Sequence, residues 1–310
     1  MARKPFFHAP LRHSAVMHRR TRRQLQRWPA PVRGMLWMVA GGLCFSFLNT
    51  LARVLSQQLD VYQAQFLRYL LGLIVMLPLV WRHGLQAYRP VNVAGQFWRG
   101  AVHTLGLILW FTALPRIPLA DMTAIGFTGP IFIMIGAAWI LGEPMRRDRW
   151  VAALIGFAGV LVVVLPKMTG AGGWYNLVML ASSPVFAASF LITKALTRYE
   201  KPGVIVLWQA LTVTVLSLPM ALPHWQQPSA AQWAGFAITG VLGSLGHYCL
   251  TRAFHTADIS ATQSLRFLDL VWASLLGWLV FADVPSSSTW AGALVILLST
   301  VWIARRESRR

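Results

Sequence analysis

Ten apolar stretches of about 20 residues run along this chain, a length that suits an α-helix crossing a bilayer. They are too long for the strands of a membrane barrel and lack the alternation of such strands. Hydrophobic residues make up 56% of the 310 residues and charged residues 12%, against roughly 45–50% and 25% in soluble proteins. We therefore expect an all-α membrane protein with ten transmembrane helices. The expected spans are residues 34-54, 62-81, 93-114, 118-141, 147-166, 174-195, 204-223, 231-254, 258-281 and 286-305.

Positive charge is concentrated on one side of the expected spans, and the net charge is +19. The opposite loops hold only Arg116 and Lys167, with Arg53 near a helix end. Because Lys and Arg are enriched on the cytoplasmic side of inner-membrane proteins, we expect both termini in the cytoplasm of a bacterium. The charge also favours anionic lipid over a nucleic-acid partner. The loops after the second, fourth and sixth spans carry Arg82, Arg89, Arg99, Arg146, Arg147, Arg149, Arg198 and Lys201.

Residues 1-33 contain many arginines and no Asp or Glu. They could form a transit segment, but a basic cytoplasmic tail is the preferred interpretation, because the expected topology requires a basic N-terminus. The expected organisation is this tail, a first five-helix repeat over 34-166, a second over 174-305, and a short tail over 306-310.

The second half of the chain repeats the first at an offset of 140 residues. The matches pair Gly106 with Gly246, Ala113 with Ala253, Phe127 with Phe267, Glu143 with Asp283 and Trp150 with Trp290. Earlier in the repeat the offset is 141, which pairs Arg53 with Lys194, Arg68 with Gln209 and Pro78 with Pro219, and so implies a one-residue slip before Gly100. Five spans per repeat is an odd number, so the two repeats are inverted in the membrane. Inverted repeats are typical of secondary transporters, although duplication is also a simple way to build a helical bundle.

Several motifs give this repeat a family resemblance. They are the run from Arg99 through Gly106, ALPRIPLADMTAIGFTGPIF from Ala113, LGEPMRRDRW ending at Trp150, and LLGWLVFADVPSSSTWAGALVIL over 275-297. Over residues 34 to 305 the chain resembles the EamA repeat of the drug/metabolite transporter superfamily. The resemblance implies a ten-helix transporter with a central cavity, which moves small organic metabolites by alternating access. Arg53, Lys194 and Arg68 resemble family positions, whereas Gln209 and Asp283 depart from the family pattern.

Two charged residues lie near the middle of the ninth span, Arg266 and Asp269. At positions i and i+3 they share a helix face and can neutralise each other, and charges in a bilayer usually face a cavity or a partner. The matching residues of the fourth span are Gly126 and Gly129, which leave room. We expect Arg266 to bind an anionic group of an anionic or zwitterionic cargo, while Asp269 positions the arginine or exchanges a proton. The alternative is a permanent ion pair that fixes helix packing.

Pro130 lacks an N–H group, so it should free the carbonyl of Gly126 and kink the fourth helix at mid-membrane. Broken helices at this depth present backbone polar groups to the cargo of transporters. Pro130 is therefore a candidate binding-site residue together with the two glycines.

Other polar residues within the spans are weaker candidates. Arg68 and Asp121 lie at similar depth and could form a gate, although Arg68 could also extend to the membrane surface. The basic helix ends at Arg53 and Lys194 are further gating candidates. The binding candidates are His103, Trp110, His247, Tyr248 and Asn49. Histidine titrates near neutral pH and could couple transport to protons, but a hydrogen-bonded structural histidine is the simpler interpretation.

Competing functions have less support. An intramembrane enzyme acting on a lipid could use His103, His247 or Asp269, but no nucleophile stands beside a base. A passive channel needs a polar lining or a charged ring. The sequence holds no ATPase motif, and Cys44 and Cys249 are expected to pack without a metal. We therefore predict a non-enzymatic secondary transporter without a cofactor, whose partners are a small-molecule cargo, membrane lipid and, in the coupled version, protons.

Overall fold

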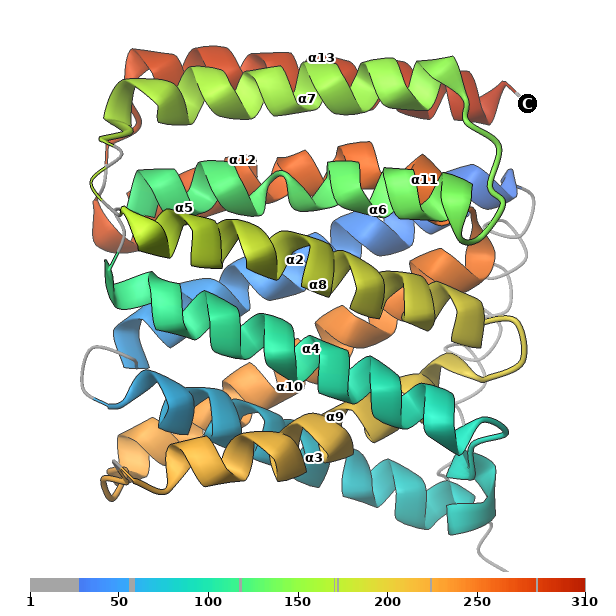
Figure 1. Cartoon of the computed structure of the whole chain (residues 1–310), viewed down its shortest axis with the longest axis vertical. Coiled ribbons are helices and arrows are strands. Elements are labelled where there is room, and N and C mark those ends of the chain that lie inside the picture. Colours follow the sequence, from blue (N-terminus) through green and yellow to red (C-terminus); the bar gives the residue numbers. More distant parts are fainter. Residues whose placement is uncertain are drawn as a thin grey trace, which may run out of the picture.

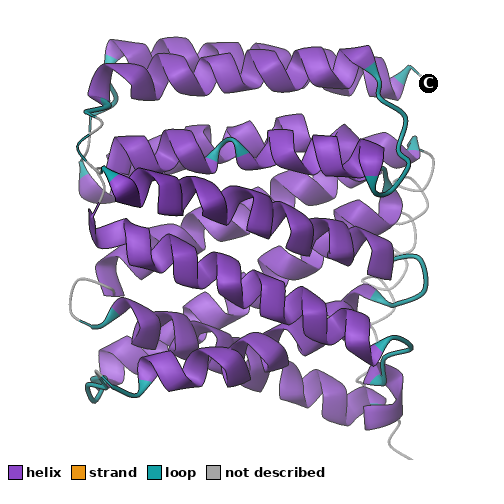
Figure 2. Cartoon of the chain, viewed as in Figure 1, coloured by secondary structure: helices purple, strands orange, loops and turns teal. Residues whose placement is uncertain are grey.

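The computed structural model describes residues 28–55, 59–116, 119–169, 171, 173–223, 225–282 and 284–309, and the regular structure in these ranges is all helical (Figure 2). The α-helices are α2 (Ala30–Leu55), α3 (Val61–His83), α4 (Val93–Ala113), α5 (Leu119–Gly126), α6 (Gly129–Trp139), α7 (Arg147–Val164), α8 (Trp174–Leu196), α9 (Pro202–Ala221), α10 (Ala230–Thr256), α11 (Ile259–Thr262), α12 (Leu268–Phe281) and α13 (Ser287–Ser308). The 3-10 helices are η1 (Leu85–Tyr88), η2 (Leu114–Arg116), η3 (Leu165–Lys167) and η4 (Gln263–Phe267).

These helices account for the ten expected spans. The fourth span is divided into α5 and α6, and the ninth into α11, η4 and α12. Among the described residues, α2, α3, α8, α9 and α13 are long and apolar enough to cross a membrane unaided. The predicted ten-helix membrane fold is confirmed.

Side-chain caps explain where several helices begin. Asp60 accepts hydrogen bonds from the backbone N–H groups of Tyr62 and Gln63, at 2.9 and 3.2 Å, and so caps α3. Ser229 and Gln232 form a reciprocal capping box at the start of α10. Each cap satisfies backbone donors that have no partner within the helix.

The packing of the helices has the symmetry of two inverted repeats. Helix α2 packs along α10, and α8, its counterpart in the second repeat, packs along α4. The equivalent helices α3 and α9 contact each other, as do α7 and α13, which lie side by side at one edge of the bundle (Figure 1). A Cβ atom added to Gly246 would lie 3.0 Å from the ring of Phe45, and one added to Gly106 would lie 2.9 Å from the ring of Phe186. These equivalent contacts confirm the predicted pair of inverted five-helix repeats.

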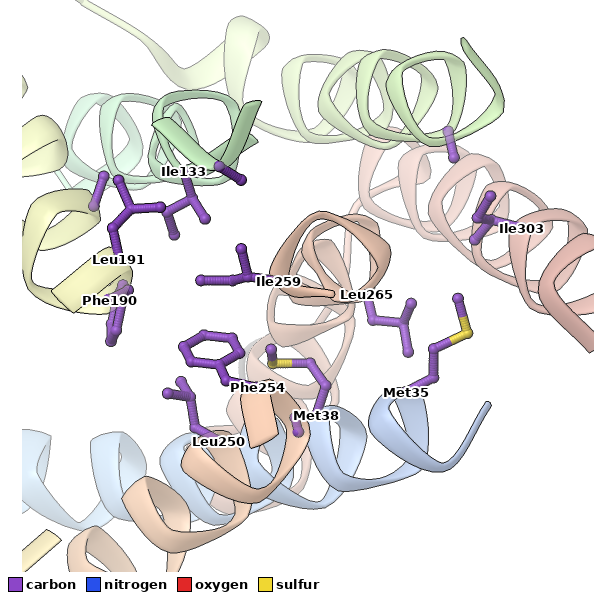
Figure 3. Packing of buried hydrophobic residues seen from close by; sticks show 14 residues of the cluster. Met35, Met38, Ile133, Phe190, Leu191, Leu250, Phe254, Ile259, Leu265 and Ile303 are labelled. Atoms are coloured by element: carbon purple, nitrogen blue, oxygen red, sulfur yellow. The ribbon is translucent and has the colours of Figure 1, made fainter. Parts of the chain in front are cut away.

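The largest apolar core lies where α2, α8 and α10 meet the broken ninth span (Figure 3). Its large buried members include Met38 of α2, Phe190 of α8 and Phe254 of α10, with Ile259 of α11 against them. The core therefore joins elements of both repeats, and it holds the break in the ninth span in place.

The fourth and ninth spans, which are equivalent in the two repeats, are both interrupted, and at equivalent positions. The fourth span breaks at Phe127 and Thr128, directly before Gly129 and Pro130, so the break expected from Pro130 is present. Beside the break, the carbonyl of Ile125 accepts hydrogen bonds from the backbone N–H of Thr128 at 3.0 Å and from the hydroxyls of Thr128 at 2.6 Å and Ser183 at 3.3 Å.

The ninth span breaks at η4, although it contains no proline there. Phe127 and Phe267 occupy equivalent positions beside the two breaks, and their ring centroids lie 5.9 Å apart. The sequence predicts one continuous helix here, and that expectation is wrong. Arg266 lies in η4, whereas Asp269 lies in the first turn of α12.

Candidate functional site

The hydroxyl of Tyr69 joins the two repeats at the centre of the bundle. This buried oxygen on α3 lies 3.0 Å from Nε2 of His103 on α4 and 3.3 Å from Nε2 of His247 on α10. Helices α4 and α10 are the equivalent third helices of the two repeats, and the imidazole centroids are 5.6 Å apart. The two histidines, predicted separately, therefore belong to one hydrogen-bonded cluster.

Aromatic rings surround this cluster from both repeats. Phe45 packs against His247 with ring centroids 5.0 Å apart, and its counterpart Phe186 packs against His103 at 5.2 Å. Because aromatic pairs in these edge-to-face arrangements attract each other, the imidazoles are held in position as well as enclosed. We name the group of Phe45, Tyr69, His103, Phe186 and His247 the central cluster.

Two arginines extend the central cluster. The guanidinium of Arg68 lies 5.3 Å from the centroid of the Tyr69 ring, and that of Arg266 lies 5.1 Å from the centroid of Phe190. Such positions allow cation–π attraction. Each arginine also keeps N–H groups that can donate to carbonyl or anionic oxygens of a bound molecule.

A small cavity adjoins the cluster between α3, α9 and α10. Its lining includes Arg68, Tyr69, Gln209, Gly243 and His247, and it has room for about one water molecule. Neither side-chain polar atom of the buried Gln209 has a hydrogen-bond partner. A metabolite could therefore enter only if α3, α9 and α10 moved apart. The side-chain amide of Gln209 would then be available to form hydrogen bonds with it.

No ion pair among the described residues joins Asp269 to Arg266, although the two charges interact electrostatically. Their charged groups are absent from the ion pairs that the described part of the chain contains. A Cβ atom added to Gly42 would lie 2.3 Å from Oδ1 of Asp269, so the carboxylate rests on the backbone of α2. The 3-10 turn between the two residues explains the difference, because a side chain in that turn leaves the direction it would have in an α-helix.

The other candidates in the middle of the membrane are distributed around the cluster. A Cβ atom added to Gly129 would meet no atom within 4 Å, and one added to Gly126 would meet only Met179 at 3.7 Å. Trp110 packs on Phe111 with ring centroids 4.8 Å apart. Tyr248 points away from its neighbour His247 and packs against Trp37 of α2, and Asn49 is exposed on α2.

The expected gating residues are only partly described. Lys194 donates hydrogen bonds to the carbonyls of Phe254 and Ala257, at 2.7 and 2.6 Å, and so ties the end of α8 to the end of α10. The side chains of Arg53 and Asp121 lie outside the described residues. The expected contact between Arg68 and Asp121 therefore stays a prediction.

Arg99 is not the loop residue that its place in the sequence suggested. It lies within α4 and is completely buried. Its Nε donates to the hydroxyl of Thr193 on α8 at 2.5 Å. The hydroxyl of Ser189 lies 3.4 Å from Nδ1 of His103 and donates to the carbonyl of Arg99 at 3.2 Å. A polar track thus runs from the central cluster along the α4–α8 interface.

A second group of charges lies at the end of the bundle where α2 begins and α13 ends, here named the Ser308 end (Figure 1). Glu307 of α13 is completely buried, and it pairs with Nε of Arg149 at 3.0 Å and with Nη1 of Arg146 at 3.1 Å. Arg149 also pairs with Asp258, just before α11, at 3.0 Å. Glu143 accepts hydrogen bonds from the backbone N–H groups of Ile259 and Ser260, the first residues of α11. These contacts hold the broken ninth span to α7 and α13.

Two inverted helical repeats that share one polar centre define a membrane carrier. The profile of the EamA-like transporter family matches residues 32–165 and again residues 173–305. The chain belongs to the EamA-like transporter family.

Similar proteins of known assignment are transporters of small molecules. A riboflavin transporter of Rhizobium johnstonii is 34% identical over 282 residues, covering 90% of this chain and 93% of the relative. A riboflavin transporter of Vibrio cholerae is 32% identical over 291 residues, with coverages of 90% and 95%. An S-adenosylmethionine uptake transporter of Rickettsia felis is 28% identical over 276 residues, with coverages of 89% and 94%.

A solved structure titled "Crystal structure of protein" superposes with a TM-score of 0.76 at 18% identity, covering 89% of this chain and 98% of that one, which supports the fold. Together with the family match, the similar proteins identify the chain as an integral membrane protein of a bacterial membrane and a secondary transporter of a small organic metabolite.

Proposed function

We propose that this transporter takes up riboflavin by alternating access, with the central cluster as its binding site. The hydroxyl of Tyr69 carries the proposal, because it is held by a histidine from each repeat. Two relatives above 30% identity are riboflavin transporters. A flavin ring is planar, so it can stack on the aromatic side chains, and its imide can pair with an amide such as that of Gln209.

The uncharged ring of riboflavin differs from the anionic or zwitterionic cargo that Arg266 suggested. Guanidinium groups also donate to neutral carbonyl oxygens, and the flavin ring carries two such oxygens. Arg68 lines the cavity beside Gln209, and so it can supply these donors. We infer that the arginines orient the ring by hydrogen bonds.

Symmetry supports alternating access. The α2–α10 and α4–α8 interfaces are equivalent under the repeat and involve helices of both halves. When two equivalent interfaces exchange conformations, the central site opens first to one side and then to the other. With the positively charged loops inside, both termini lie in the cytoplasm, and the cargo crosses without chemical change.

Uptake of labelled riboflavin into proteoliposomes tests the proposal. Tyr69→Phe is expected to raise the concentration for half-maximal uptake about ten-fold. The substitution removes the hydroxyl that hydrogen-bonds both His103 and His247 at the proposed binding site. Tyr248→Phe is the matched control, since Tyr248 packs on Trp37 outside the cluster, and its uptake should be unchanged. Riboflavin recovered from the vesicles should be chemically intact. Absence of saturable uptake by the unsubstituted protein would disprove the assignment, and equal effects of the two variants would disprove the site.

We further propose that uptake is coupled to protons through Asp269. Its carboxylate lies within the membrane against α2, near Arg266 but without an ion pair or a hydrogen bond among the described residues. A carboxylate without hydrogen bonds can gain and lose a proton without breaking a network. The approach of Oδ1 to Gly42 couples that change to the packing of α2 on α12.

Asp269→Asn is expected to retain riboflavin exchange between equal concentrations but to lose accumulation driven by an imposed pH gradient. The amide has nearly the shape of the carboxylic acid and cannot release the proton. Asp258→Asn is the control, because Asp258 is partly exposed at the Ser308 end. Accumulation by Asp269→Asn that still follows the pH gradient would rule out this residue as the coupling site.

A further inference from the structure

Arg99 is a completely buried cation without a carboxylate partner among the described side chains. Within the described ranges, the guanidinium of Arg99 donates to the hydroxyl of Thr193 and to the carbonyl of Ile205, at 3.5 Å from Nη1, and Nη2 has no partner there. Placing a charge in a low-dielectric interior is costly unless it is paired and hydrogen-bonded. The site therefore lacks about one negative charge.

The nearby carboxylates cannot supply that charge. Glu200 accepts hydrogen bonds from the backbone N–H groups of Val91 and Asn92, before α4. Glu307 and Asp258 pair with Arg149, and Glu143 binds the start of α11. The remaining carboxylates with described side chains are Asp60, which caps α3, Asp148, which pairs with Arg146, and Asp269, which rests on α2.

A second unpartnered group lies one turn from Arg99. Gln96 is completely buried, and both its amide nitrogen and its amide oxygen lack partners. Residues at i and i+3 are neighbours on a helix surface, so Gln96 and Arg99 mark the same part of α4. The guanidinium Nη2 and the amide NH₂ together supply N–H donors that suit an oxyanion, while the hydroxyl of Thr193 donates to the carbonyl of Ser189 and accepts from Nε of Arg99.

The other repeat shows that packing alone does not require these residues. The equivalent α2–α10 interface has Thr239 in place of Arg99, Phe236 in place of Gln96, Ala52 in place of Thr193 and Leu48 in place of Ser189. Leu48 is completely buried there and contacts the position of Gly243, which is equivalent to His103. The same backbone arrangement is thus packed with uncharged side chains in one copy and with a cation that lacks a carboxylate partner among the described residues in the other.

We propose that Arg99 and Gln96, with Thr193 holding the guanidinium in place, form an oxyanion subsite that binds a phosphate or carboxylate group between α4, α8 and α9. The subsite lies toward the Ser308 end, where α8 ends and α9 begins. Arg99 lies one helical turn of α4, about 6 Å, from His103 of the central cluster. A molecule that joins a ring system to an anionic group can occupy both sites, and a free anion can occupy the subsite alone. The subsite does not depend on riboflavin being the cargo.

Thermal unfolding of the purified full-length protein tests the subsite with inorganic phosphate, riboflavin and riboflavin 5′-phosphate as probes. A ligand that binds only the folded protein stabilises it in proportion to its concentration and affinity. We expect phosphate and riboflavin 5′-phosphate to raise the melting temperature. Arg99→Gln should weaken binding of both anions at least ten-fold and leave the shift by riboflavin intact. Arg198→Gln is the matched control, because Arg198 is exposed near the same end of the bundle.

The probes also separate the two sources of the anion. Tighter binding of riboflavin 5′-phosphate than of either riboflavin or phosphate identifies an anionic group on a molecule that reaches the central cluster. Equal binding of the two phosphates, without competition from riboflavin, identifies a free-anion site. If Arg99→Gln does not fold, Gln96→Leu should still weaken anion binding. Failure of both anions to stabilise the unsubstituted protein, or equal stabilisation of the variants, would overturn the proposal, whatever the outcome with riboflavin.

Discussion

Replacing Glu307 by glutamine is expected to lower the free energy of unfolding by about 3 kcal/mol, because it leaves the buried Arg149 and the partly buried Arg146 short of a negative charge. Glu307 is completely buried and accepts from Arg149 at 3.0 Å and from Arg146 at 3.1 Å. Their other carboxylate partners, Asp258 and Asp148, remain after the substitution, which places the expected loss at the low end for a broken buried pair. Chemical unfolding in detergent micelles, followed by tryptophan fluorescence, measures this change.

Asp258→Asn is the control for burial. Its pair with Arg149 has the same length, 3.0 Å, but the Asp258 side chain is 44% exposed, whereas that of Glu307 is 0% exposed. Exposed pairs contribute about 0–1 kcal/mol, so this variant should be nearly as stable as the unsubstituted protein. Losses of equal size would mean that burial does not set the strength of these pairs.

The number of spans could be predicted because membrane thickness sets helix length, and the inversion followed from an odd number of spans per repeat. The break beside Pro130 could also be predicted from the sequence, since proline removes a backbone donor. The break at η4 was not, because no proline marks it. There the buried side-chain amide of Gln263 donates to the carbonyl of Ile259 at 2.9 Å, a local bond that only the surrounding packing selects.

The candidate site was predicted in part. His103 and His247 stood out as titratable residues within apolar stretches, but Tyr69 did not, because tyrosine is common in membrane helices. Arg99 was counted with the loop arginines although it lies inside the expected span 93-114. The repeat itself held the missing signal, since Tyr69 matches Ala210 and Arg99 matches Thr239. The central residues Tyr69, His103 and His247 match Ala210, Gly243 and Leu107, and the buried cation Arg99 matches an uncharged residue.

Gly240→Ala is expected to lower the free energy of unfolding by about 2–3 kcal/mol. A Cβ atom at this position of α10 would lie 2.6 Å from the backbone nitrogen of Gly72 and 2.8 Å from the carbonyl carbon of Leu71, both on α3. Backbone atoms cannot move aside as a flexible side chain can, so the two helices would have to separate, and overpacking of this kind costs about 1–3 kcal/mol. Close contact at small residues is a common way in which membrane helices associate.

Gly129→Ala is the matched control for Gly240→Ala, because a Cβ atom on Gly129 would meet no atom within 4 Å. Its free energy of unfolding should change by less than about 1 kcal/mol, which separates the cost of a clash from the general effect of replacing glycine. Gly240 also lines the cavity beside the Tyr69 hydroxyl, so separation of α3 from α10 should widen the central site. Equal stability of the two variants would show that α3 and α10 are not in close contact at Gly240.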